Sequence, residues 1–187
     1  SFSEQEQIRR EKLAALRAAG QDPYLLTKCD VTAKSAEILA DYDAYDGKEV
    51  SLAGRMISRR VMGKASFAHL LDTAGDIQFY VRRDDVGEDA YKDFKEMDLG
   101  DVLFIRGFVF KTKTGEISVH VQGLTLLAKC LKPLPEKFHG LTDTDLRYRQ
   151  RYLDMVVNPE VRDTFRKRSQ IITAIRTFLD ERGFLEV

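Results

Sequence analysis

Apolar and polar residues alternate along several stretches in the middle of the chain, which is the period of a half-buried β-strand. The clearest stretch is 77–82, where the apolar residues face one way while Gln78, Tyr80 and Arg82 face the other. Runs of this kind, separated by short polar turns, predict a sheet of successive strands. The predicted strands are Val50–Met62, Ser66–Asp72, 77–82, Val102–Phe110 and a fifth that begins at Ile117.

Between the third and fourth predicted strands the period changes to that of a helix. Tyr91, Phe94 and Met97 recur at spacing three and mark the apolar stripe of one short helix. Gly54 lies inside the first strand, where a glycine permits the sharp bend that a small barrel requires. Three strands, a helix and two strands is the order of the five-stranded OB barrel, whose second and third strands bind oligonucleotides. We therefore predict a mainly β fold with flanking helices, built on an OB-fold barrel, although other folds share this order.

Two helices are predicted before the barrel. Ser3 and Glu6 form a capping-box pattern at the start of the first, which ends at Gly20. The second is expected over Thr32–Tyr42. Charged helices of this kind usually cover the edge of a domain.

After the barrel the sequence predicts a linker stiffened by Pro133, a short basic helix over Leu146–Tyr152 and a long helix with Asn158 as its N-cap and Pro159 as its first residue. The long helix ends at Gly183, and Phe184–Val187 is predicted to start a strand. Because natural domains rarely end within a strand, we expect the chain to be a piece of a larger protein. The long helix must bury an apolar stripe and is expected to self-associate through it. This stripe comprises Val161, Phe165, Ile172, Ile175 and Leu179.

The composition is that of a soluble globular protein, with 43% apolar and 32% charged residues in a chain of 187. Basic and acidic residues balance at 30 each, which excludes binding through a uniformly basic surface. The charges are nevertheless segmented, because residues 48–83 hold seven basic against three acidic residues and residues 84–101 hold two against eight. No apolar run reaches about 20 residues, and the first residues lack the apolar region of a secretory signal. We expect a cytoplasmic protein.

Catalytic and metal-binding constellations are scarce. His69, His120 and His139 fall in separate elements, so each is expected to be a surface or structural histidine. Cys29 and Cys130 lack metal-ligand spacing and are expected to be free thiols. No phosphate-binding glycine loop or nucleophile elbow occurs. We expect no metal, no cofactor and no complete active site in this chain.

The basic strands contain a better candidate. Alternation places Phe67 and His69 on the opposite face of the second strand from Ala68 and Leu70. An exposed ring at Phe67 would offer a stacking platform worth roughly 1–3 kcal/mol per base. The pattern alone leaves open the alternative that Phe67 packs inward and that the nearby cations are only solvated.

Five strings of the sequence, RRVMGKASF, KTKTGE, PLPEKFHGL, YRQRYLDM and FLDERGFLEV, resemble the bacterial class II lysyl-tRNA synthetases in this order. The resemblance implies a parent enzyme that activates lysine with ATP and Mg²⁺ and esterifies tRNA. It divides the chain into a helical segment 1–47, an OB-fold anticodon-binding domain 48–130, a linker 131–157 and the start of motif 1 at 158–187. Motif 1 would form the homodimer interface. Motifs 2 and 3, which hold ATP, Mg²⁺ and lysine in the family, are absent, so the fragment should be inactive.

The resemblance also implies four anticodon contacts, Arg60, Phe67, Gln78 and Glu116. Arg60 only donates hydrogen bonds and suits a carbonyl oxygen of uracil, whereas an ionised Glu116 only accepts and suits the uracil imino N–H. Cytosine presents a lone pair at that position, which a carboxylate would repel. Gln78 can donate or accept, and Phe67 would stack the splayed base. The expected phosphate contacts are Arg55, Arg59, Lys64, Arg82, Lys111 and Lys113.

Three rivals remain at this point. The aspartyl and asparaginyl relatives are disfavoured by GKASF and KTKTGE, which follow the lysyl pattern. A generic single-strand-binding OB module would not need the long helix after Asn158. A purely structural dimerisation module would not bind tRNA. The sequence departs from the family pattern at His69 and Leu71, where polar residues are usual.

Overall fold

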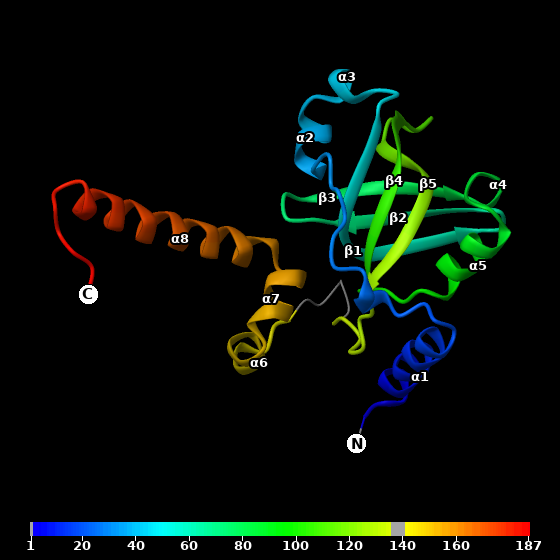
Figure 1. Ribbon diagram of the computed structural model, residues 1–187, viewed down its shortest axis with the longest axis horizontal. Coiled ribbons are helices and arrows are strands. Elements are labelled where there is room, and N and C mark those ends of the chain that lie inside the picture. The colour runs from blue at the N-terminus through cyan, green and yellow to red at the C-terminus, as the bar shows by residue number, and fades with distance from the viewer. Residues whose placement is uncertain (1, 136–140) are drawn as a thin grey trace. The chain divides into compact units, whose positions relative to one another are not determined.

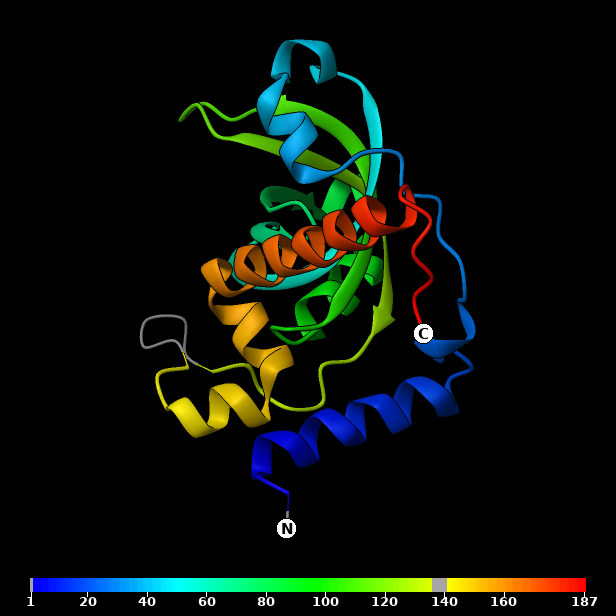
Figure 2. The ribbon, with the colours of Figure 1, turned by 90° about the vertical axis from the view of Figure 1, so that its left-hand side faces the viewer.

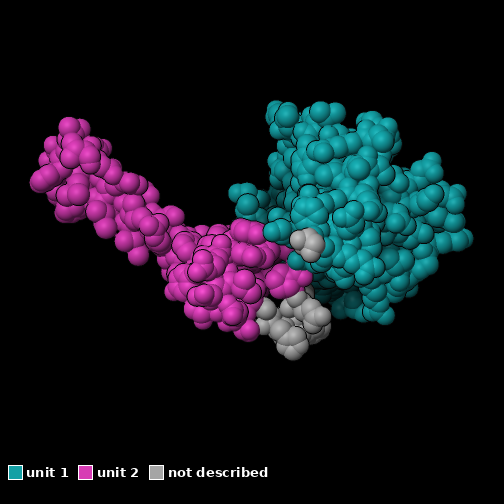
Figure 3. Space-filling view, turned by 90° about the horizontal axis from the view of Figure 1, so that it is seen from below, with its two compact units in different colours: residues 1–133 teal, residues 134–187 magenta. Residues whose placement is uncertain are grey.

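The computed structural model describes residues 2–135 and 141–187. The chain divides into two compact units, Ser1–Pro133 and Leu134–Val187 (Figure 3). The first unit contains a β-barrel with its N-terminal helices, and the second is helical. Part of the predicted linker, residues 136–140 including His139, lies outside the described residues.

Within the described part of the chain, five strands form a closed barrel in the spatial order β1-β2-β3-β5-β4 (Figure 1). β3 and β5 pair in parallel, and the other neighbouring strands are antiparallel. The long first strand closes the barrel, because residues 49–55 pair with β4 and residues 55–62 pair with β2. The predicted OB-type barrel is confirmed. Its strands are β1 (Glu49–Met62), β2 (Ala65–Leu71), β3 (Asp76–Arg82), β4 (Val102–Lys111) and β5 (Ile117–Ala128).

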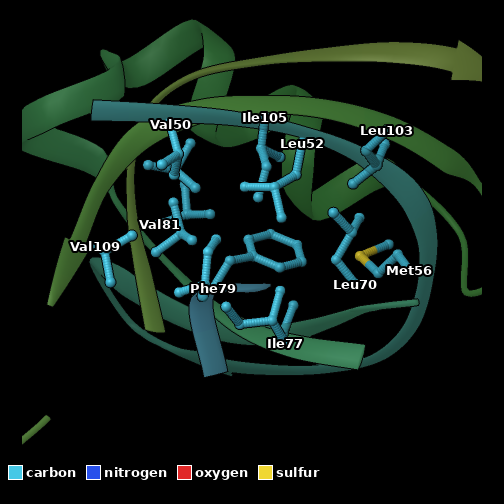
Figure 4. Close-up of a cluster of buried hydrophobic side chains, with 14 of the residues drawn as sticks. Val50, Leu52, Met56, Leu70, Ile77, Phe79, Val81, Leu103, Ile105 and Val109 are labelled. Carbon is cyan, nitrogen blue, oxygen red and sulfur yellow. The ribbon is translucent and has the colours of Figure 1, made fainter. Parts of the chain in front are cut away.

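The barrel interior is filled by alternate residues of the strands. In β2 and β3 burial repeats at every second position, and Leu70, Ile77 and Phe79 are at most 2% exposed. Figure 4 shows the Phe79 ring in the middle of this core, between Leu52 and Ile77. Burial of each such side chain stabilises the fold by roughly 1.5–3 kcal/mol. The same alternation directs the intervening side chains of β2 and β3 to the outside of the barrel.

Two glycines allow strands to approach closely. A Cβ atom on Gly54 would lie 2.6 Å from the carbonyl oxygen of Leu71. Gly54 therefore lies where β1 changes its pairing partner from β4 to β2, close to the bend expected there. A Cβ atom on Gly107 would overlap the backbone carbonyl group of His120. Neither position accepts a larger residue without a shift of the backbone.

Two helices connect β3 to β4, and these are α4 (Arg83–Val86) and α5 (Glu88–Glu96). The predicted apolar stripe is confirmed for Tyr91 and Phe94, which are 2% and 0% exposed. Met97 is the residue after the last turn of α5 and is half-buried. The additional short helix was not predicted. It is separated from α5 by Gly87, whose φ of 92° is readily adopted only by glycine.

The N-terminal helices agree with the sequence in part. The hydroxyl of Ser3 accepts a hydrogen bond from the Glu6 N–H at 3.2 Å, as an N-cap should. The prediction of one helix over Thr32–Tyr42 is wrong. The Thr32 N–H donates to the Ser51 carbonyl at 3.0 Å, so this residue runs extended beside β1 and the helix starts later. The elements are α1 (Glu4–Ala18), the 3₁₀ turn η1 (Pro23–Leu25), α2 (Ser35–Ala40) and α3 (Tyr42–Tyr45).

The described part of the second unit contains α6 (Thr144–Arg149), α7 (Arg151–Val157) and α8 (Pro159–Asp180). The prediction of one continuous helix over Leu146–Tyr152 is wrong, because the chain breaks at Gln150 (φ −121°, ψ 56°). The buried Asp154 carboxylate accepts from Arg147 Nε at 2.9 Å and from Arg151 Nη1 at 2.5 Å. The break lets cations from both short helices neutralise one buried charge.

The long helix begins at Pro159 as predicted. Its predicted apolar stripe is buried near the start of the helix and exposed towards its end. Val161 is 7% exposed, whereas Ile175 and Leu179 are 55% and 39% exposed. The predicted strand Phe184–Val187 is wrong, since these residues are irregular. A strand needs a hydrogen-bonded neighbour, and no described strand pairs with them.

Candidate nucleic-acid interface

A groove of about 890 Å³ lies on the outside of the barrel over β2 and β3. Its walls come from the end of β1, from β5 and from the hairpin that joins β4 to β5. This hairpin extends beyond the rest of the barrel (Figure 2). The groove therefore occupies the face that OB folds use for oligonucleotides.

Aromatic rings form much of the groove surface. Phe67 is half-buried while its neighbour Ala68 is 1% exposed, so the Phe67 ring lies outside the barrel and does not pack into the core. The ring centroids of Phe67 and Tyr80 are 4.9 Å apart. Tyr80 in turn lies 5.1 Å from His120 and 6.2 Å from Phe110. The rings of four strands thus form one continuous surface on which bases can stack.

Two of the predicted polar contacts flank the Phe67 ring. Arg60 of β1 pairs with Phe67 of β2 across the sheet, and its side chain is exposed. Gln78 lies on β3, and its Oε1 accepts a hydrogen bond from the Ser118 hydroxyl at 2.9 Å. Because the amide oxygen is engaged, the amide N–H groups of Gln78 are the ones available to a ligand. The structure brings Arg60, Phe67 and Gln78 together in the groove.

Glu116, the fourth predicted contact, is exposed at the base of the β4–β5 hairpin and does not line the groove. Its backbone N–H donates to the Thr112 hydroxyl at 3.0 Å, which closes the hairpin. Two residues further along, the Ser118 hydroxyl reaches Gln78. Glu116 therefore lies next to the groove, on the segment that supplies its hairpin wall.

Four of the six predicted phosphate contacts are exposed cations, and two of them line the groove. Arg82 and Lys113 line it, and Arg82 also pairs with Asp84 at 3.1 Å. Lys64 is exposed at the turn between β1 and β2. The Lys111 ammonium lies 4.3 Å from the centre of the Tyr42 ring, at the start of the hairpin.

The other two cations serve the barrel itself. Arg59 Nη1 donates to the carbonyl oxygens of Phe94 and Met97 at 2.8 and 2.6 Å, where α5 ends. Arg55 Nη1 donates to the Gly100 carbonyl at 2.6 Å. Arg59 thereby caps the C-terminal end of α5, where the Phe94 carbonyl also accepts from the Met97 N–H. Arg55 and Arg59 therefore anchor parts of the barrel, Arg59 also lines the groove, and a phosphate contact from either residue stays a prediction.

Sequence reasoning missed two histidine–carboxylate pairs beside the rings. His120 Nε2 lies 2.7 Å from Asp85 Oδ2, and His69 Nδ1 lies 3.2 Å from Asp76 Oδ2. Both histidines line the groove. The alternation of strands placed Tyr80 and His69 outside the barrel, but it could not reveal that β5 pairs with β3 and brings His120 beside them.

Other kinds of site are not found in the parts of the chain that the structure describes. Among residues 2–135 and 141–187, no group of three or more His, Cys, Asp or Glu side chains is arranged to hold a metal ion. Cys29 and Cys130 are free thiols. None of the described helices is long and apolar enough to span a membrane.

Comparison with known families gives the class of protein. Residues 50–127 match the family described as OB-fold nucleic acid binding domain, and residues 143–187 match the family described as tRNA synthetases class II (D, K and N). The chain is therefore similar to OB-fold nucleic acid binding domains over its barrel and to class II tRNA synthetases over its last 45 residues.

Individual proteins with similar sequences define the similarity more specifically. The chain is 56% identical over 186 residues to the lysine–tRNA ligase of Clostridium perfringens, and 55% identical over 180 residues to that of Thermoanaerobacter pseudethanolicus. These alignments cover 100% and 96% of the chain, but only 37% and 36% of the relatives. The resemblance to bacterial lysyl-tRNA synthetases is confirmed, and the chain spans little more than a third of such a protein.

Proposed function

We propose that the groove over β2 and β3 binds the anticodon loop of a tRNA with a uridine-rich lysine anticodon. The observation that carries this proposal is the Phe67 ring outside the barrel, in one groove with the exposed Arg60 and with Gln78, whose amide N–H groups have no hydrogen-bond partner among the described residues. The similarity to lysine–tRNA ligases supports the same assignment.

The proposed contacts match the Watson–Crick edge of uracil, which presents two carbonyl oxygens on either side of one N–H. Arg60 and Gln78 donate to carbonyl oxygens, and the Glu116 carboxylate accepts from the N–H. Phe67 stacks on the face of the base, which must be splayed out of the loop to reach it. Hydrogen bonds to charged groups contribute about 1.5–3 kcal/mol each, so Arg60 and Glu116 are the main sources of discrimination.

The exposed cations position the RNA backbone without reading its sequence. Lys113 and Arg82 line the groove, while Lys64 and Lys111 stand at the turns on either side of it. Their contribution depends on salt, because phosphate binding releases counterions.

The remaining proposals concern the parent protein. We propose that it is a cytoplasmic ligase that activates lysine with ATP and charges tRNA. We propose that motifs 2 and 3 of the parent hold its ATP and Mg²⁺. The exposed end of the α8 stripe, with Ile175 and Leu179, would be covered by the homodimer partner. We further propose the domain limits 1–47, 48–130, 131–157 and 158–187.

Binding of anticodon stem-loop RNAs tests the function directly. Fluorescence anisotropy of the 187-residue chain should show tighter binding to a hairpin with a UUU anticodon in its loop than to hairpins with GUC or GUU anticodons. These two represent the aspartyl and asparaginyl rivals. Glu116→Gln should reduce this preference, because an amide can donate as well as accept. Equal affinity for all loops would favour a generic single-strand-binding module, and no binding at low salt would favour a purely structural one.

A further inference from the structure

Two imidazole–carboxylate pairs stand on opposite sides of the groove, one on β2 and one on β5. The His69 side chain is 31% exposed and that of His120 is 20% exposed, so both reach solvent at the groove surface. One ring nitrogen of each histidine lies within hydrogen-bond distance of its carboxylate partner. The second ring nitrogen has no partner among the described residues. Neither pair is used by the proposed reading of uracil.

The surroundings of each histidine identify the charges that it feels. His120 packs against the rings of Tyr80 from β3 and of Phe108 and Phe110 from β4, and the charged group facing it is Asp85 of α4.

His69 pairs across the sheet with Ser58 of β1 and Gln78 of β3, and its ring lies against Asp76. Both histidines share the groove with cations, which are Arg59, Arg60, Arg82 and Lys113. Neither Asp76 nor Asp85 forms an ion pair with a lysine or arginine in the described part of the chain.

The charge of each pair therefore depends on one proton. With a neutral imidazole the pair carries one negative charge beside the groove, whereas with an imidazolium ion it carries none. A bound RNA backbone is repelled by the first state and not by the second. The imidazolium ion also has an N–H on both nitrogens, so it can keep its carboxylate and donate to the RNA at the same time.

We infer that His69 and His120 are RNA-contacting residues that bind as imidazolium ions, so that RNA binding takes up protons at the groove. This inference rests on the proposed function of the groove. Removal of one negative charge at about 10 Å from a phosphate, in a medium close to water, corresponds to about a two- to fourfold gain in affinity for each pair.

The test compares the affinity of the 187-residue chain for the UUU hairpin RNA at about pH 6 and pH 8, at fixed ionic strength. Wild-type chain should bind more tightly at the lower pH by about 4- to 16-fold, and the double variant His69→Gln/His120→Gln should lose this dependence. Equal wild-type affinity at both pH values, or a dependence that survives in the double variant, would overturn the inference.

One substitution separates this role from a purely structural one. Asp85→Asn should tighten binding at pH 8 by about two- to fourfold, because it removes the negative charge while keeping a side chain of the same shape. If Asp85 only braced α4 against β5, the same change would weaken binding, which would contradict the inference. Asp84→Asn is the matched control on α4. It pairs with Arg82 rather than with a histidine, so its effect should be the same at both pH values.

Failure of the inference is distinguishable from failure of the proposed function. If Phe67→Ala weakens binding but wild-type affinity is independent of pH, the groove binds RNA and the histidines do not take up protons. If Phe67→Ala leaves affinity unchanged, the assignment of the groove itself is wrong.

Discussion

Phe67→Ala is the substitution that most directly probes the aromatic surface of the groove. The ring lies outside the barrel, half-buried against Tyr80 at a centroid distance of 4.9 Å. Its removal deletes the stacking platform next to Arg60 and Gln78 but leaves the barrel interior untouched, because Ala68 and Leu70 are the β2 residues that face the core.

The expected loss follows from the energetics of stacking. A base stacked on an aromatic side chain contributes roughly 1–3 kcal/mol, which corresponds to about a 5- to 150-fold change in affinity. The tilt of 43° between the Phe67 and Tyr80 rings means that Tyr80 cannot offer a coplanar replacement surface. We therefore expect a loss of about tenfold or more.

The assay is fluorescence anisotropy with the UUU hairpin RNA, at one fixed salt concentration because phosphate contacts make all affinities salt-dependent. Phe104→Ala is the matched control. Phe104 is also a half-buried ring on a barrel strand, but it does not line the groove. Thermal unfolding of both variants establishes that the barrel is intact.

A second RNA locates the stacked base. A hairpin that lacks one base of the anticodon should bind the wild-type chain more weakly, and Phe67→Ala should add little further loss when the missing base is the stacked one. Wild-type affinity in Phe67→Ala, or additive losses at every anticodon position, would refute the reasoning.

Three further predictions concern the core, the acid stability and the cations. Phe79→Ala should lower the free energy of unfolding by about 3–5 kcal/mol in urea denaturation, because its ring is fully buried in the barrel. Partial burial raises the pKa of Asp98, but hydrogen bonds and charges from Lys12 and Lys129 outweigh it and hold the pKa below its usual value. The stability that this carboxylate contributes is therefore full above about pH 4 and is lost as pH falls through the lowered pKa, and Asp98→Asn should make acid unfolding less steep in a pH titration followed by circular dichroism. Lys113→Ala should weaken binding to all RNA loops alike and reduce the slope of log affinity against log salt by about 0.7.

The strands could be predicted because successive residues of a barrel strand face alternately the core and the outside, so apolar and polar residues alternate in the sequence. A residue of β2 or β3 lies either in the core or outside, and the alternation of apolar and polar residues states which. The period of two places Phe67 on the opposite face of β2 from Leu70, and the structure shows that Leu70 is the residue in the core and Phe67 the one outside. The choice of Arg60, Phe67, Gln78 and Glu116 as contacts came instead from the resemblance to bacterial lysyl-tRNA synthetases.

The predictions that were wrong concern elements that depend on contacts between residues distant in the sequence. Thr32 was expected to start a helix, but its hydrogen bonds with Ser51 hold it extended. The break at Gln150 accompanies the burial of Asp154, which nothing in the local pattern reveals. Arg59 was expected to be available for phosphates, but its Nη1 donates a hydrogen bond to the Phe94 carbonyl at the end of α5.

The central claim is that the groove reads uracil through its N–H, and one measurement tests it most directly. The affinity of the chain for a hairpin with a UUU loop is compared with that for the same hairpin with a UCU loop, under identical salt and pH. The account predicts a preference for UUU of about tenfold or more, because cytosine presents a lone pair where Glu116 needs a donor. Equal affinity for the two loops would contradict it.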